Sequence, residues 1–537
     1  MIRAPAASPA KPVARALRAA AAIVHRHPRI AAPVLGALAA LGFQPLAIWP
    51  AALVGLAGLL ALMAGAARAR DAALIGWLWG LGHFTLGNNW IATAFTYQAK
   101  MPVWLGWLAV PSLSLYLALY PALAAAAGWC FRQRRVAFVA GMAGAWIIAE
   151  WLRGWVFTGF AWNPLAMVAL GPFTRPGLAA LAPWLGTYGL SGLVVGLAGL
   201  WWLAASRRIT PGSVALAAVP VLALVWPGPT AQRDAGAGAR FTLVQPNIAQ
   251  SELDDPAHYE AQFLKTALLS EANQPGRRLV LWPESGVPDY LREGYPAWLY
   301  RATTFAADPA VARRRIGMVI GPDALLLTGA TDLIARNGAI TGAWNVVTAL
   351  DGAGTIRGSY AKAHLVPYGE YLPQRWLLGA IGLDKLVPGD LDFTPGPGPR
   401  TLDLGPWGQV GVQVCYEIIF SGAVVDPAHR PQFLFNPTND GWFGQWGPPQ
   451  HLAQARMRAI EEGLPVLRAT VSGISAVIDA DGRVRAHIPT GASGRIDMAL
   501  PPAHRPTLFA WLGNGLPLGV AIVLLGLAGL ALRPSRR

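Results

Sequence analysis

Long apolar runs dominate the first 230 residues of the 537-residue chain, and one more run closes it. Eight of them stand out, at residues 29–44, 46–66, 72–94, 102–131, 136–156, 178–204, 212–228 and 507–532. A helix needs about 20 apolar residues to cross the hydrocarbon core of a bilayer. The pattern therefore predicts a polytopic α-helical membrane part with about eight spans, and Pro45 and Pro50 interrupt it where the first two runs meet.

Basic residues test this topology independently. Five Lys/Arg clusters, before residue 30 and at 68–70, 132–135, 207–208 and 533–537, fall in alternate loops of the predicted spans. Cytoplasmic loops of membrane proteins are enriched in Lys and Arg. We therefore expect both termini in the cytoplasm and three regions: a membrane part at 1–228, a periplasmic domain at 229–505, and a last span with its tail at 506–537.

The net charge of +15 has the same origin. The predicted membrane regions carry 19 basic and 2 acidic residues, which leaves 24 basic against 26 acidic residues in 229–505. The basic character thus belongs to cytoplasmic loops that face anionic lipid. It indicates a membrane and no nucleic acid as partner.

Strand-like and helix-like runs begin after a polar, Gly-rich linker at 232–240. We predict helices at 257–273 and 449–462, and strands at 241–247, 278–284, 318–320, 344–350, 355–362, 410–416, 432–436, 466–470 and 475–478. Helices and strands mix without strict alternation, which favours a layered α/β sandwich over a barrel.

Three residues in this domain have the chemistry of an acyl-transfer site. Glu284 and Cys415 are each expected at the end of a strand, and Lys362 follows a predicted hairpin. A carboxylate can take the proton of a thiol, the thiolate can attack a carbonyl carbon, and an ammonium group can stabilise the oxyanion. Each residue also has a common structural interpretation, as a salt-bridged carboxylate, a surface lysine or a core cysteine. The second cysteine, Cys130, is expected across the membrane from Cys415, so the two should not pair.

The motifs around these residues are specific. They are Trp282-Pro-Glu-Ser285, Lys362-Ala-His-Leu-Val-Pro-Tyr-Gly-Glu370, Cys415-Tyr-Glu417, Pro246-Asn-Ile-Ala-Gln250, Asn436 to Gly444 and Arg456 to Glu461, with Glu150 to Phe160 and Tyr188 to Ser191 in the membrane part. Their order resembles the Glu-Lys-Cys triad of the nitrilase superfamily. Combined with eight predicted spans, the chain resembles the apolipoprotein N-acyltransferase family of Gram-negative bacteria. Asp254 and Val471 stand where that family often has Trp and Asn.

The resemblance implies a nitrilase-like α-β-β-α sandwich and a role for each motif residue. Cys415 would be the nucleophile, Glu284 the general base and Lys362 the oxyanion stabiliser. The implied supporting residues are Glu370, Tyr416 and Glu417.

The implied reaction moves an acyl chain from a phospholipid to Cys415 as a thioester. The chain then passes to the α-amino group of the S-diacylglyceryl cysteine at the N-terminus of an apolipoprotein, the last step of lipoprotein maturation. The kinetics would be ping-pong, in a monomer of the bacterial inner membrane. No cofactor or metal is expected, because the nine His are scattered without ligand spacing.

Two further groups have more than one interpretation. Trp442, Phe443 and Trp446 lie in a Gly-rich run and could form a mobile lid that admits acyl chains, or pack the domain onto its membrane base. Glu150 and Arg153, three residues apart in an apolar run, are expected to pair.

Two other functions are compatible with parts of the sequence. A membrane-tethered amidase would use the same triad but let water resolve the thioester. A transporter or receptor could carry an inert nitrilase-like domain, although the scarcity of charges inside the spans argues against a substrate pathway.

Overall fold

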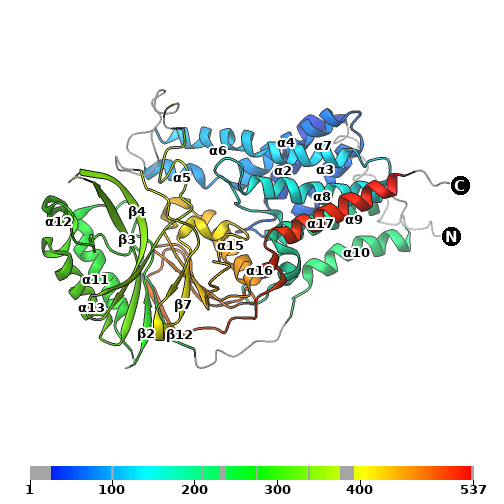
Figure 1. Ribbon diagram of the computed structural model, residues 1–537. Coiled ribbons are helices and arrows are strands. Elements are labelled where there is room, and N and C mark those ends of the chain that lie inside the picture. Colours follow the sequence, from blue (N-terminus) through cyan, green and yellow to red (C-terminus); the bar gives the residue numbers. More distant parts are fainter. Residues whose placement is uncertain are drawn as a thin grey trace, which may run out of the picture.

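The computed structural model describes residues 26–97, 102–206, 210–229, 238–273, 276–336, 339–374, 376 and 392–533. Figure 1 shows a helical part, built from the first half of the chain and its last helix, beside an α/β part. Some sequence features lie outside the described residues: the basic residues before 26, Lys100, Arg207 and Arg208, the last four residues, and most of the linker at 232–240.

The helical part is a bundle of roughly aligned helices (Figure 1). Its main members are α2 (Pro28–Ala40), α3 (Trp49–Ala64), α4 (Ala69–Gly87), α6 (Trp104–Leu117), α7 (Leu119–Trp129), α8 (Arg135–Arg153), α9 (Ala182–Ala205), α10 (Pro211–Val225) and α17 (Gly515–Leu532). Glycines allow close approach of the backbones, as is common between membrane helices. A Cβ at Gly36 of α2 would lie 1.9 Å from the carbonyl oxygen of Trp79 in α4.

Four helical segments of the described chain are long and apolar enough to cross a membrane: Trp104–Trp129, Arg135–Arg153, Leu178–Ala205 and Gly515–Leu532. The sequence pattern predicted about eight. Three further apolar helices, α2, α3 and α10, have 10–17 residues. A helix rises about 1.5 Å per residue, so the 13 residues of α2 span only about 20 Å of a core that is about 30 Å thick. The predicted span at 72–94 is also interrupted, because α4 ends at Gly87 before the short helix α5 (Ile91–Ala94).

The α/β part contains two six-stranded sheets with matching strand arrangements. The first has the order β12-β1-β2-β3-β4-β5 and the second β11-β10-β9-β8-β7-β6. The strands are β1 (Arg240–Gln245), β2 (Arg278–Leu281), β3 (Ala324–Arg336), β4 (Ala339–Asp351), β5 (Ile356–Ala361), β6 (Thr401–Asp403), β7 (Gln409–Val412), β8 (Phe433–Thr438), β9 (Val466–Thr470), β10 (Ser475–Ile478), β11 (Val484–Ile488) and β12 (Gly494–Ala499). In each sheet a parallel trio, β1-β2-β3 or β7-β8-β9, is flanked by antiparallel strands.

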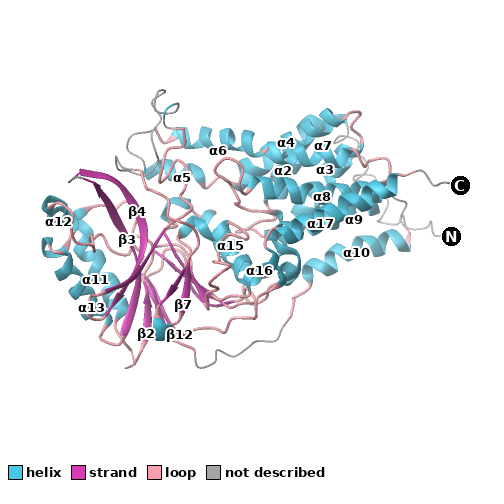
Figure 2. Ribbon diagram, viewed as in Figure 1, coloured by secondary structure: helices cyan, strands magenta, loops and turns pink. Residues whose placement is uncertain are grey.

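The two sheets pack face to face, with helices on their outer sides (Figure 2). Alternation along β2 shows how: Leu279 and Leu281 enter the core between the sheets, whereas Val280 packs toward the helices α11 (Tyr259–Ser270) and α13 (Pro309–Ile320). Successive side chains of a strand point to opposite faces, so an unbroken apolar strand is buried on both. The predicted layered sandwich is therefore present.

Helix α15 (Gly447–Glu462) joins the two parts of the molecule. Leu452, Ala455 and Ala459 pack in the core of the α/β part, whereas Met457 and Ile460 pack in the core of the helical bundle. A helix that is buried on every side cannot show a polar solvent face. In this protein it also fixes the α/β part on the bundle.

Two predictions about local structure were wrong. Residues 318–320 are the last turn of α13 and not a strand, because the Asp308 side chain caps that helix and Ile316 and Ile320, one turn apart, bury against the first sheet. A three-residue apolar window cannot distinguish the two structures. Residues 410–416 are a strand only to Val412. Strands β3, β6, β11 and β12 were not predicted.

Candidate active site

Cys415 lies just beyond the carboxyl end of β7, in a tight bend of the chain. β7 ends at Val412, and Cys415 begins a 3₁₀ turn that runs to Ile419. Its φ is +51°, a left-handed conformation that residues with a Cβ seldom adopt, and only 4% of the residue is exposed. Such strain is typical of functional positions, where the surroundings hold the backbone.

Lys362, which follows β5, is held between two carboxylates. Its Nζ lies 3.0 Å from Oε1 of Glu370 and 3.4 Å from Oε1 of Glu284. Asn345 of β4 donates to the same two oxygens, at 2.8 Å each. All four side chains are largely buried, so the structure brings together three of the residues that the sequence singled out, and adds an amide that it missed.

Glu284 reaches this cluster because β2 stops early. Pro283 has no N–H to extend the ladder, and the chain leaves the sheet there. The second carboxylate oxygen of Glu284 accepts a hydrogen bond from the Asn439 N–H, at 2.9 Å. Asn439 follows β8, beside the strand that carries Cys415. Glu284 therefore bridges the carboxyl ends of parallel strands from both sheets, where ligand sites of open α/β sheets commonly lie.

The charges of the cluster set the state of the thiol. Burial raises the pKa of Cys415 well above its usual value, and the Glu284 carboxylate adds to this, whereas Lys362 opposes it. Burial also disfavours the ammonium of Lys362, but Glu370 and Glu284 outweigh it and hold the pKa of Lys362 above its usual value. At neutral pH the site thus contains a protonated thiol beside a charged lysine that faces two carboxyl groups.

Glu417 connects two segments: the turn that begins at Cys415, called the nucleophile turn below, and the loop that follows Lys362, called the lysine loop below. One of its oxygens accepts from the Tyr360 hydroxyl at 2.8 Å and from the N–H groups of Ala363 and His364 at 2.7 and 3.1 Å. The other accepts from the Val414 N–H at 2.7 Å. Burial raises the pKa of Glu417 to about 7, and these hydrogen bonds oppose the shift. Glu417, which the sequence suggested as a supporting residue, thus hydrogen-bonds the backbone on both sides of the contact between the two segments.

Two hydrogen bonds connect the site directly to the helical part. The Tyr416 hydroxyl donates to the Gly159 carbonyl at 3.2 Å, and His364 Nε2 lies 3.0 Å from the Thr158 carbonyl. Both carbonyls belong to the segment that follows α8. The nucleophile turn therefore rests on the helical bundle and not on solvent.

The three aromatic residues considered as a lid have different surroundings. Phe443 is buried, with its ring 4.7 Å from Trp90 and 5.6 Å from Trp162 of the helical part. Trp442 is half-buried, and its ring meets that of Tyr97 edge-on at 5.6 Å. These contacts favour the packing interpretation for Phe443, and a lid role of Trp442 and Trp446 stays a prediction.

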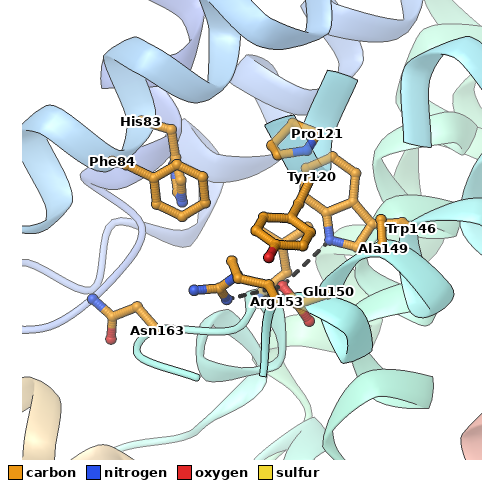
Figure 3. A pocket seen from close by; sticks show the side chains of 10 residues that line it. His83, Phe84, Tyr120, Pro121, Trp146, Ala149, Glu150, Arg153 and Asn163 are labelled. Atoms are coloured by element: carbon orange, nitrogen blue, oxygen red, sulfur yellow. Dashed lines mark hydrogen bonds and ion pairs between the residues drawn. The ribbon is translucent and has the colours of Figure 1, made fainter. Parts of the chain in front are cut away.

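The predicted pair of Glu150 and Arg153 is present in α8, with Arg153 Nη2 3.8 Å from Glu150 Oε1. It lies in the helical part beside a cavity of about 10 Å³, roughly the room that one water molecule needs. His83, Tyr120 and Asn163 also line this cavity (Figure 3). Arg153 also donates to the carbonyls of Phe160 and Trp162, at 2.9 and 2.8 Å. The pair thus holds the segment that touches Tyr416.

Sequence reasoning missed several polar residues close to the cysteine. Asn345 is half-buried, whereas Asp440, His451 and Arg468 are buried and stand behind Cys415. Asp440 was within a quoted motif. The helix face that carries His451 also carries Gln454 and Arg458, so its pattern gave no signal for His451. Among the described residues, no group of three or more His, Cys, Asp or Glu side chains could hold a metal ion.

The α/β part has the architecture and the thiol, carboxylate and amine of a carbon-nitrogen hydrolase domain. The family profile described as "Carbon-nitrogen hydrolase" matches residues 240–504, and that described as "Apolipoprotein N-acyltransferase N-terminal domain" matches residues 35–200. The chain belongs to the apolipoprotein N-acyltransferase family.

Relatives carrying that name are similar over nearly their whole length. The protein from Bradyrhizobium diazoefficiens is 35% identical over 94% of both chains, and that from Caulobacter vibrioides is 34% identical over 90% of both. Among solved structures, a CN-hydrolase superfamily protein from Xanthomonas campestris covers 49% of this chain and 91% of its own, with 18% identity and a TM-score of 0.34.

Proposed function

We propose that this protein transfers an acyl chain from a phospholipid to the N-terminal S-diacylglyceryl cysteine of apolipoproteins, through a thioester on Cys415. One observation carries the proposal beyond the name of its relatives. The turn that holds Cys415 is hydrogen-bonded to the segment after α8, so the thiol is held against the apolar helical part, where both lipid-anchored substrates would meet it.

In the first half-reaction, Glu284 takes the proton of the Cys415 thiol while the sulfur attacks the ester carbonyl carbon. The Lys362 ammonium, kept charged by Glu284 and Glu370, stabilises the oxyanion of the tetrahedral intermediate. The ester C–O bond then breaks, Glu284 returns the proton to the leaving oxygen, and a lysophospholipid departs.

In the second half-reaction, the α-amino group of the diacylglyceryl cysteine attacks the thioester carbonyl. Glu284 accepts a proton from the amine, and Lys362 again stabilises the oxyanion. The C–S bond then breaks, and Glu284 passes the proton to the sulfur, which returns Cys415 as a thiol. The product carries a new amide bond. Glu370 keeps Lys362 in place, and Tyr416 and Glu417 hold the nucleophile turn against the helical part and the lysine loop.

We also propose the finer topology as an eight-span arrangement in the bacterial inner membrane, with both termini in the cytoplasm and residues 229–505 in the periplasm. The alternating basic clusters support it, as does the direction of α17, which runs away from the α/β part (Figure 1). The proposed regions are 1–228, 229–505 and 506–537, in a monomer. Short helices such as α2 would then span with flanking residues reaching the interface.

Intact-mass spectrometry of the purified protein after incubation with phospholipid tests the chemistry. We expect one added acyl mass on the wild type and on Cys130→Ser, which removes only the exposed cysteine, and none on Cys415→Ser. Addition of a diacylglyceryl-cysteine peptide should discharge the adduct into N-acylated peptide. An adduct that only water releases would point to the amidase, which the comparisons do not support, and no adduct at Cys415 would reject the triad.

A further inference from the structure

A second polar cluster, distinct from the proposed triad, lies behind the nucleophile turn. It consists of Asp440 after β8, His451 on α15 and Arg468 on β9, whose side chains are wholly buried. His451 Nδ1 lies 2.9 Å from Oδ1 of Asp440, and Arg468 Nη2 donates to Oδ2 of Asp440 at 2.7 Å. The proposed acyl transfer gives none of these residues a role.

The cluster ends at the backbone of the nucleophile. His451 Nε2 lies 3.1 Å from the carbonyl oxygen of Cys415, and Asn436 Nδ2 approaches the same oxygen at 3.4 Å. A carbonyl oxygen only accepts hydrogen bonds, so the proton of the imidazole must be on Nε2 whether the ring is neutral or charged. Nδ1 then accepts from Arg468 Nη2, 3.1 Å away, or donates to Asp440. The ring is held on both sides.

This contact acts on a backbone that needs support. Cys415 has a left-handed φ of +51°, which costs enough in a residue with a Cβ that its population falls roughly 5- to 30-fold when nothing holds it. The peptide that follows is planar, so holding the carbonyl of Cys415 also fixes the direction of the Tyr416 N–H. The hydrogen bonds to the Cys415 carbonyl therefore help to set the conformation of the turn and the direction of the Cys415 sulfur.

We propose that His451 is a positioning residue for Cys415: its Nε2 proton holds the Cys415 carbonyl, Asp440 and Arg468 fix the ring, and the nucleophile keeps its left-handed conformation through both half-reactions. The inference rests on the proposed acyl transfer for its kinetic consequence. Both half-reactions pass through a tetrahedral intermediate on the same sulfur, but they use different substrates. A Cys415 sulfur that points in the wrong direction should therefore slow both half-reactions to the same extent. Damage to one substrate site would slow only the half-reaction that uses this substrate.

Two substitutions of His451 by amide residues test the roles of Nε2 and Nδ1 separately. In His451→Gln the side-chain amide reaches the place of Nε2 and can still donate to the Cys415 carbonyl. In His451→Asn the shorter amide reaches only the place of Nδ1, beside Asp440. Gln454→Leu is the matched control, because Gln454 is buried on the same helix and donates only to the Gln450 carbonyl, at 3.4 Å.

The experiment uses the full-length protein in mixed phospholipid–detergent micelles and measures thioester formation and its discharge by peptide separately, per folded protein. We expect His451→Asn to slow both steps roughly 5- to 30-fold with an unchanged dependence on phospholipid concentration. His451→Gln should stay within about threefold of the wild type, as should Gln454→Leu. Equal rates for the Asn and Gln variants, or slowing of one step alone, would overturn the inference.

A readout without acyl transfer keeps this test separate from the proposed function. Alkylation of Cys415 by iodoacetamide, in a Cys130→Ser background, reports the geometry of the thiol by itself. The alkylation rate of His451→Asn should differ from that of the wild type, whereas His451→Gln should be alkylated at the wild-type rate. If the wild type forms no thioester but the alkylation rates follow this order, the acyl-transfer proposal fails and the role of His451 stands. Equal alkylation rates in all variants would reject the role of His451.

Discussion

Two of the buried groups of charges in this protein differ in balance. In the helical part, Arg153 faces one carboxylate, Glu150, and donates its remaining hydrogen bonds to backbone carbonyls. In the α/β part, Lys362 faces two carboxylates, Glu284 and Glu370, beside a protonated thiol. In the first group one cation faces one carboxyl group, whereas in the second one cation faces two.

The comparison shows that burial of charge does not by itself mark a site of chemistry. A balanced ion pair has no excess charge for a further proton to neutralise, and breaking it mainly costs stability. An unbalanced group can accept one more proton, and the Cys415 thiol, whose pKa is raised partly by Glu284, can supply it. Perturbed groups of this second kind are those expected at active sites.

The largest expected effect comes from Lys362→Met, which leaves two buried carboxylates without their cation. Loss of the oxyanion partner should slow both half-reactions by about 10²- to 10³-fold. The unpaired carboxylates should also destabilise the fold by about 3–5 kcal/mol. Thioester formation by intact mass and thermal unfolding in detergent measure the two effects. Lys265→Met, at an exposed lysine of the same domain, is the control, and a Lys362→Met enzyme with wild-type rates would reject the oxyanion role.

A smaller effect, on stability alone, is expected from Arg153→Met. The change leaves the Glu150 carboxylate buried without its cation and frees the carbonyls of Phe160 and Trp162, at a cost of about 3–5 kcal/mol. Activity per folded molecule should fall less than about tenfold, because Arg153 acts on Tyr416 only through the segment between them.

Arg175→Met, at an exposed arginine of the helical part, serves as the reference for this measurement. The opposite outcome is a loss of activity as large as that of Lys362→Met in protein that is still folded. It would show that the pair of Glu150 and Arg153 takes part in the chemistry, and the two groups would then not differ in function.

The smallest expected effect is a change in the pH dependence of stability. Burial raises the pKa of Glu417 from 4.5 to about 7 in the folded protein. The folded state then binds the proton more tightly than the unfolded state. The stabilising contribution is complete below about pH 4.5 and is lost as the pH rises through 7, by up to about 3 kcal/mol. Wild-type protein should therefore unfold at a lower temperature at pH 8 than at pH 5.5.

Glu417→Gln should reduce this slope without abolishing it, because burial and the neighbouring Glu461 also raise the pKa of Glu462 to about 7. Melting curves at pH 5.5 and pH 8 compare the two proteins. An unchanged slope in the Gln variant would mean that Glu417 does not titrate in this range and keeps its charge behind Cys415.

Much of the architecture was readable from local patterns. Period-two alternation and β-branched runs located most strands, including β1, β4, β5 and β8, within a few residues. The pattern was insufficient where the context decides, as at 318–320, where packing of Ile316 and Ile320 makes a helix. It also predicted eight continuous spans where four described segments are long and apolar enough, because an apolar run can be divided between two helices and the turn between them, as at 72–94.

By itself, the sequence determined the chemical inventory: one cysteine in the α/β part, the carboxylates and the lysine in recognisable motifs, and the apolar runs that call for a membrane. Only the tertiary structure decided which groups meet. It placed Glu284 and Glu370 on one ammonium, turned Cys415 into a left-handed bend, and brought His451 to its carbonyl from 36 residues away. The reason is physical: hydrogen bonds and ion pairs depend on distances of about 3 Å, and the packing of two sheets and α15 sets those distances.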